Sequence, residues 1–120
     1  MKSPRAEWWP GTLDMLILKT LSQSPQHGYG IARELRRRSQ EFLHVQEGTL
    51  YPALHRLEQL REIDSYWGAS DANRRARYYR LTARGKRKLE QRRSAWQRMA
   101  QAITQVLSGA DPGMAAEPSP

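Results

Sequence analysis

A basic segment in the second half of the chain holds the residues best suited to binding chemistry. Between residues 74 and 93 the sequence carries ten basic side chains and one acid, Glu90, which gives this segment a charge of +9. The whole 120-residue chain has a net charge of +8, so the remainder sums to −1 by subtraction. Gathered arginines and lysines can neutralise consecutive phosphates and release their counterions. The segment therefore indicates a polyanion-binding surface, although a solvated, arginine-rich helix face would have the same composition.

Residues that could catalyse a reaction or hold a metal form no recognisable pattern. The three histidines, His27, His44 and His55, lie on separate segments and lack a metal-binding spacing such as H-E-x-x-H. The chain has no cysteine, which excludes disulfides, thiol catalysis and cysteine-based metal sites. The glycines of "HGYG" (27–30) have no preceding strand, as a nucleotide-binding loop would require. We therefore expect a binding protein without a cofactor, and not an enzyme.

Length and hydropathy favour one domain in the cytoplasm. A chain of 120 residues suits a single modest core, and small domains often gain stability from a partner chain. The longest apolar run, around "MLILKTL", is broken by Lys19 and is too short to span a bilayer. The first ten residues have no apolar core of the signal-peptide type.

Apolar residues at helical spacing predict three helices in the first sixty residues, and alternation then predicts two strands. Thr12 is the expected N-cap of the first helix, and Thr82 that of a last helix after the strands. Pro52 lies inside the third helix, where we expect it near the first turn because its missing N–H costs little there. The expected elements are helices at 12–21, at 29–38 and from 48 or 49 onward, strands at 63–68 and 75–81, and a helix at 82–107.

This order predicts a fold that is mainly α with a small β-hairpin (α+β), a winged helix-turn-helix followed by a long helix. We assign the winged helix-turn-helix to residues 11–81 and a dimerisation helix to 82–107. An N-terminal arm or short helix (1–10) and a disordered tail (108–120) are expected at the ends. In such a fold the third helix can enter the major groove of double-stranded DNA, and the hairpin, or wing, can lie alongside.

The outward side of the third helix offers candidates for DNA contact. Hydroxyl groups near a helix N-terminus suit phosphate contacts, and histidine or arginine can reach base edges. An alternative is that Tyr51 packs on the rim of the core and that Arg56 pairs with Glu47 or Glu58. The candidates are Thr49, Tyr51, His55 and Arg56.

Three arginines at the expected wing, Arg74, Arg75 and Arg77, are further candidates. An arginine at a hairpin tip can enter a narrow minor groove, where negative potential concentrates. The alternative is an ordinary solvated turn, with Arg77 on a backbone phosphate or a neighbouring acid. Tyr29, at the start of the second helix, could reach a phosphate or could pack between the first two helices.

Several blocks of the sequence resemble the PadR-type transcriptional regulators. The blocks are "HGYGI" (27–31), "GTLYPALHRLE" (48–58) and "RRARYYRLTARG" (74–85), and the resemblance extends over residues 11–107. A single helix after the wing resembles the shorter PadR subgroup. The resemblance implies a homodimer joined by its last helices, and most often a repressor whose operator affinity drops when a small molecule binds. Phenolic acids and flat aromatic drugs are known effector classes of the family.

The last helix carries apolar residues at a heptad-like spacing. They are Leu89, Trp96, Met99, Ile103 and Val106, which follow one another at intervals of 7, 3, 4 and 3 residues. Two copies of Trp96 on a two-fold axis could flank a flat aromatic molecule, because stacked rings gain about 0.5–1.5 kcal/mol beyond burial. The alternative is that Trp96 fills the dimer core. The candidate effector pocket and dimer interface comprise Trp8, Trp9, Leu89, Trp96, Met99, Ile103 and Val106.

A different functional class stays open for the whole protein. It is a winged-helix protein-interaction module without specific DNA readout.

One departure from the resemblance falls after the third helix. The family usually has a glycine and a bulky apolar residue there, and this chain has Arg61 and Glu62. A glycine accepts the positive φ of a helix C-terminus, so its loss is expected to extend the helix or reshape the turn.

Overall fold

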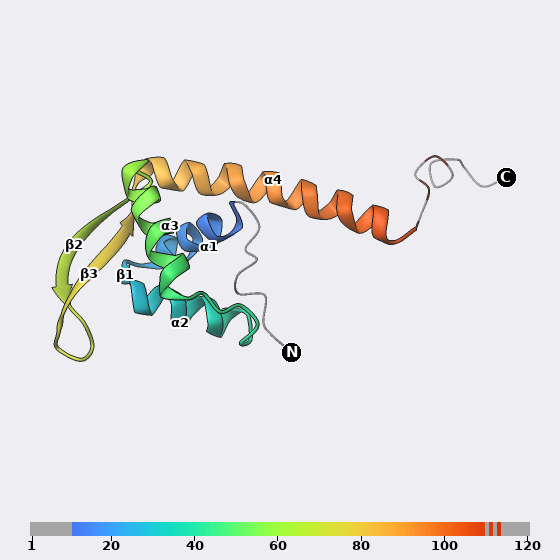
Figure 1. Cartoon of the computed structure of the whole chain (residues 1–120). Helices are drawn as coiled ribbons and strands as arrows, with labels where there is room; N and C mark the ends of the chain where they lie inside the picture. The colour runs from blue at the N-terminus through green and yellow to red at the C-terminus, as the bar shows by residue number, and fades with distance from the viewer. Residues whose placement is uncertain (1–10, 110, 112, 114–120) are drawn as a thin grey trace.

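Four helices and three short strands make up the computed structural model, which describes residues 11–109, 111 and 113. The predicted arm at residues 1–10, with Trp8 and Trp9, lies outside the described residues, as does most of the predicted tail. The elements are α1 (Thr12–Gln23), β1 (Gln26–His27), α2 (Gly28–Arg38), α3 (Glu47–Gln59), β2 (Ile63–Ala69), β3 (Arg75–Leu81) and α4 (Ala83–Leu107). In Figure 1 the hairpin β2–β3 and α2 project away from α4, which extends along the opposite side.

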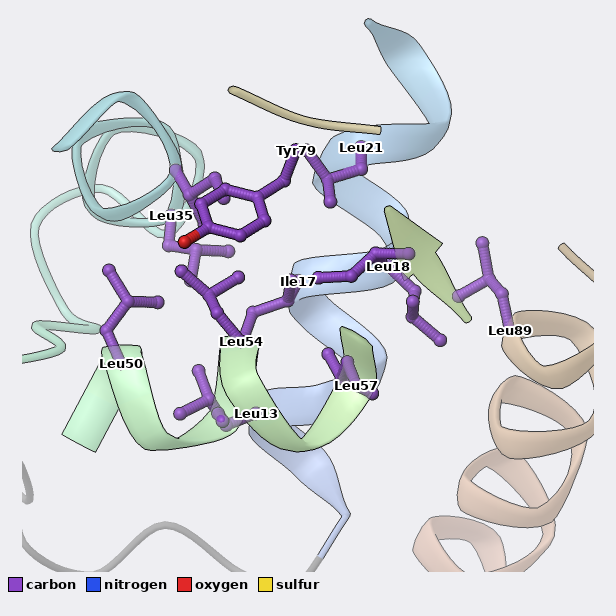
Figure 2. Packing of buried hydrophobic residues seen from close by; sticks show 13 residues of the cluster. Leu13, Ile17, Leu18, Leu21, Leu35, Leu50, Leu54, Leu57, Tyr79 and Leu89 are labelled. Carbon is purple, nitrogen blue, oxygen red and sulfur yellow. The ribbon is translucent and has the colours of Figure 1, made fainter. Parts of the chain in front are cut away.

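The hydrophobic core lies between α1, α2, α3 and the sheet. Ile17 and Leu18 of α1 and Leu54 and Leu57 of α3 are all fully buried. Figure 2 shows these side chains meeting, with Leu89 of α4 at the edge of the cluster. A buried leucine or isoleucine contributes about 1.5–3 kcal/mol relative to an exposed one, so this cluster fixes α3 on α1.

Two of the helices begin with side-chain caps. The Thr82 hydroxyl accepts a hydrogen bond from the Gly85 amide at 3.0 Å, which confirms the predicted start of α4. His27 caps α2 through Nδ1, which accepts from the Gly30 amide at 2.9 Å. The prediction that Thr12 caps α1 is wrong. Gly11 takes that position with φ of 80°, a conformation that glycine adopts without steric cost, and its carbonyl accepts from Met15.

Pro52 lies slightly deeper in α3 than predicted. The helix begins at Glu47, so Pro52 is its sixth residue and stands just beyond the first turn. Leu50 already donates to the Gln46 carbonyl at 2.8 Å. Pro52 therefore removes one intrahelical hydrogen bond, the one that the Gly48 carbonyl would accept. Gly48 is exposed, which leaves this carbonyl open to water.

The sheet has three antiparallel strands in the order β1-β3-β2, although the sequence predicts only the hairpin. Gln26 and His27, which lie between the predicted helices at 12–21 and 29–38, pair with Tyr79 and Tyr78 of β3. The hairpin register runs from Ile63 opposite Leu81 to Ala69 opposite Arg75. One sheet face therefore turns Ile63 and Tyr79 into the core, and the other carries Tyr66 and Tyr78 outward.

The turn between α3 and β2 keeps the geometry of a glycine turn without a glycine. Arg61 adopts φ of 60°, and α3 ends at Gln59 without being extended. Arg61 donates to the Glu58 carbonyl and Glu62 to the Leu57 carbonyl, both at 3.0 Å, which is the hydrogen-bond pattern of a Schellman motif. Glu62 is only 1 % exposed, and its carboxylate forms an ion pair with Arg92 of α4 at 2.5 Å.

Helix α4 packs on α1 and buries Leu89, and its later apolar residues stay exposed. The prediction that Leu89 belongs to the intersubunit seam is wrong, because Leu89 is buried in the core of its own chain. Trp96, Met99, Ile103 and Val106 are exposed on the same helix. No helix in the described part of the chain is long and apolar enough to cross a membrane.

Candidate nucleic-acid interface

A cavity of about 600 Å³ lies between the wing, the start of α2 and the start of α3. It brings together five of the eight residues that the sequence predicts for DNA contact. These are Tyr29, Tyr51, Arg74, Arg75 and Arg77. The other three candidates, on the outer side of α3, do not line this cavity. The fold therefore gathers one aromatic and basic group at the wing and separates it from the rest of the predicted set.

Tyr51 of α3 is seated against the first turn of α2. Its ring and hydroxyl lie so close to Gly28 that a Cβ at Gly28 would collide with them. The ring is nevertheless 44 % exposed. Tyr51 thus packs on the rim of the core, as the alternative interpretation holds, and also presents surface to the cavity.

Arg77 on β3 is bound to an acid. Its guanidinium donates to the Glu58 carboxylate at 3.1 Å and to the Ser65 hydroxyl at 3.0 Å. Ser65 in turn donates to Glu58 at 2.6 Å. The hydrogen bond from Ser65, followed by those from Arg77, lowers the pKa of Glu58 below its ordinary value of 4.5. Arg77 therefore ties the wing to α3, and Glu58 offsets its charge.

Arg75 is held in a different way. Its guanidinium lies 4.2 Å from the centroid of the Trp67 ring on β2. Neither Arg75 nor its neighbour Arg74 has a carboxylate partner in the described residues. Two of the three predicted wing arginines thus keep an unneutralised charge at the cavity.

Trp67 is absent from the residues that sequence reasoning selects, although it is 56 % exposed on the wing. The signal that could have found it is register, because Trp67 stands opposite Arg77 and two pairs from Arg75 on the same sheet face. The opposite face of the hairpin holds a separate stack of Tyr66 on Tyr78, with ring centroids 5.7 Å apart.

The remaining candidates on α3 have different surroundings. Thr49 is half-buried and His55 is exposed. Arg56 pairs with Asp14 at the start of α1 at 2.5 Å, and not with Glu47 or Glu58 as the alternative proposed. The Arg56 side chain is about half exposed, but its charge is already matched by a buried acid.

A second cavity, of about 340 Å³, lies between the start of α1 and α4. Met15, Trp96, Met99 and Ile103 give it apolar walls, and Arg92 adds one cation. Val106 lies beyond it on the same helix, and Leu89 does not reach it. In the part of the chain that the structure describes, no three histidine, aspartate or glutamate side chains are grouped to hold a metal.

Comparison with known families decides the identity of the fold. The model of the transcriptional regulator PadR-like family matches residues 17–91, more than half of the chain and all of α2, α3 and the wing. The chain belongs to the PadR-like family. An uncharacterised protein of Lysinibacillus sphaericus is 33 % identical over 100 residues, which span 82 % of this chain and 91 % of that protein.

Solved structures of transcriptional regulators have the same architecture. A PadR family regulator from Clostridium difficile is 36 % identical, with a TM-score of 0.70 over 81 % of this chain and 99 % of the other. A transcriptional regulator from Clostridium thermocellum is 33 % identical, with a TM-score of 0.72 over 79 % and 92 % of the two chains. A PadR-like regulator from Bacillus cereus is 29 % identical, with a TM-score of 0.71 over 83 % and 95 %. This chain is thus a DNA-binding transcriptional regulator by family, and these relatives are described as regulators and not as enzymes.

Proposed function

We propose that this protein is a homodimeric, sequence-specific repressor whose operator affinity is lowered by a small aromatic effector. The observation that carries the proposal is the aromatic and basic cavity between α3 and the wing. It has exposed tyrosines, three arginines without acid partners and a helix N-terminus beside them. Such groups suit the phosphate and groove contacts of DNA.

In this proposal residues 11–81 form the DNA-binding head. Helix α3 lies in the major groove with Tyr51 and His55 toward DNA, and Thr49 contacts a phosphate near the helix start. Arg56 reaches DNA only by sharing or leaving Asp14, so it is the weakest candidate on the helix. Arg74 and Arg75 contact DNA at the adjacent groove, while Arg77 acts mainly through Glu58.

Helix α4, residues 83–107, joins two heads in the proposed dimer. Its exposed apolar side chains recur at spacings of 3, 4 and 3, and water contact with them is unfavourable in a free chain. Twenty-five residues give a helix of roughly 37 Å, long enough to extend past the head. Dimers of this kind bind half-sites about one helical turn apart.

The proposed effector site is the cavity between α1 and α4, closed by the second subunit. Trp96 supplies a flat ring, and Met99 and Ile103 line the same wall. A ligand there releases DNA only if it binds the two dimer shapes with different affinity. Trp8 and Trp9 stay candidates for this pocket on the basis of their sequence alone.

The experiment is a shift assay with purified protein and its own upstream DNA, titrated with salt and with random competitor. A shift that survives competitor supports a sequence-specific regulator, and added aromatic compounds should then reduce it. A shift that disappears with competitor reduces the proposal to general polyanion binding. No shift at low salt on any promoter DNA would instead favour a winged-helix protein-interaction module.

A further inference from the structure

The arginines of the head differ in whether an acid neutralises them. The head, residues 11–81, contains ten arginines, and six of them form ion pairs within it. The paired set is Arg36, Arg37, Arg38, Arg56, Arg77 and Arg80. In the described part of the chain the other four have no carboxylate partner. They are Arg33, Arg61, Arg74 and Arg75.

Three of these four arginines line the same 600 Å³ cavity. Arg33 reaches it from α2, and Arg74 and Arg75 reach it from the wing. Arg77 also lines the cavity, but Glu58 offsets its charge. Three of the four arginines without a carboxylate partner therefore lie around one hollow, on two elements that are far apart in the sequence, and one acid, Asp71, also lines it.

An aromatic ring, and not an acid, holds one arginine on each of these two elements. The Arg33 guanidinium lies 5.6 Å from the centroid of Tyr29, and that of Arg75 lies 4.2 Å from the centroid of Trp67. A ring face orients a guanidinium through cation–π attraction and leaves its charge and most of its donors free. A carboxylate orients it equally well but offsets the charge, as Glu58 does for Arg77.

We infer that Arg33 and Arg75 form a two-sided clamp that binds the sugar-phosphate backbone of DNA in this cavity, with Tyr29 and Trp67 as positioning residues. The inference rests on the proposed DNA binding and adds Arg33, Trp67 and the role of the rings. Backbone phosphates have no sequence identity, so the clamp contributes equally to operator and random DNA. It holds the head on the duplex while α3 reads bases.

The test is fluorescence anisotropy of a labelled random-sequence duplex, titrated with salt, using the full chain. Arg33→Ala and Arg75→Ala are each expected to weaken binding about 10-fold and to reduce the salt slope by about 1, because each removes one phosphate contact. Arg80→Ala is the matched control, since Arg80 lies on the same hairpin but is paired with Asp64 at 2.7 Å. It should leave the slope unchanged.

The role of Trp67 is tested with two substitutions and with a double-mutant cycle that includes Arg75→Ala. Trp67→Leu should weaken DNA binding. Trp67→Phe should retain most of the wild-type affinity because phenylalanine keeps a ring face. In the Arg75→Ala background Trp67→Leu should have no further effect on binding, which a purely structural role would not predict. Thermal unfolding of each variant checks that the wing stays folded.

The outcomes separate this inference from the proposed function. If the wild-type protein binds DNA but Arg33→Ala and Arg75→Ala keep its salt slope, the clamp is wrong and the DNA-binding proposal stands. If Trp67→Leu still weakens binding in the Arg75→Ala background, Trp67 does not act through Arg75. If the wild-type protein binds neither random nor promoter DNA, both proposals are overturned together.

Discussion

Glu62 and Arg92 join the exit of α3 to α4 through a buried ion pair. The Glu62 carboxylate receives two guanidinium hydrogen bonds, at 2.5 and 3.2 Å. Its backbone carbonyl also accepts from the Thr82 amide at 3.1 Å, just before α4 begins. Arg92 in turn borders the cavity between α1 and α4. One contact therefore connects the element proposed to read DNA with the helix proposed to bind the second subunit.

Replacing one member of this ion pair should lower the free energy of unfolding more than replacing both members. Arg92→Met leaves a buried carboxylate unpaired, and such changes cost about 3–5 kcal/mol, with the lower end expected because Arg92 is partly exposed. The double variant Glu62→Leu with Arg92→Met should recover to within about 1 kcal/mol of wild type, since apolar replacements of buried pairs are often neutral. Urea unfolding measures both. Glu90→Gln, an exposed change on α4, is the control, and additive losses in the double variant would contradict the prediction.

Arg61 should be replaceable by glycine with a gain in stability. Its φ of 60° costs a side-chain-bearing residue about 1–2 kcal/mol, which glycine avoids. Glycine also loses more entropy on folding, so the expected net gain is about 0.5–1 kcal/mol. Arg61→Ala is the matched control because it removes the guanidinium and keeps the strain. Equal midpoints of thermal unfolding for the two variants would show that this turn stores no strain.

The link between α3 and the wing should weaken in acid. The lowered pKa of Glu58 means that its stabilising contribution is complete above about pH 4.5 and is lost as the pH falls through the folded-state pKa. The difference in unfolding free energy between wild type and Glu58→Gln should therefore be constant from pH 7 to about 5 and shrink below 4.5. Other carboxylates titrate in both proteins and cancel in this difference. If this difference in unfolding free energy does not change down to pH 3, the ion pair between Glu58 and Arg77 does not contribute to the stability of the fold.

A charge within the exposed apolar face of α4 should prevent dimerisation. Ile103→Glu would bury an unpaired carboxylate in the proposed interface, which should raise the dissociation constant by about 100-fold or more. Light scattering should then give a mass near 13.9 kDa in place of twice that value. Gln101→Glu, an exposed position outside the 96, 99, 103 and 106 spacing, should leave the dimer intact. Two variants with the same mass would exclude this face as the interface.

Local sequence signals predicted most of the elements that position the candidate site. Thr82 as a cap, the alternation at 75–81 and the leucines of α3 each depend on neighbours within a few residues, and the structure has the elements that they predict. The two-residue strand β1 has no periodicity of its own and exists only because β3 pairs with it. The sequence alone therefore does not predict strand β1.

Long-range pairing accounts for most of what the sequence could not reveal about the site. Arg56 binds Asp14 from 42 residues away, and Arg92 binds Glu62 from 30 residues away. Composition shows that the charges exist, but only the fold decides which of them cancel. The division of wing arginines into Arg77, which is neutralised, and Arg75, which is not, depends on where Glu58 and Trp67 lie.

The short strand β1 gives the wing the mechanics of a cantilever. It pairs with β3 at Tyr78 and Tyr79 alone, so only there is β3 hydrogen-bonded on both of its edges, whereas the tip is supported only by the two strands of the hairpin. A hairpin held in this way is displaced most easily at its tip. In the proposed complex with DNA, Arg74 and Arg75, which lie at that end, are therefore expected to adjust to grooves of different width while α3 and the core keep their positions.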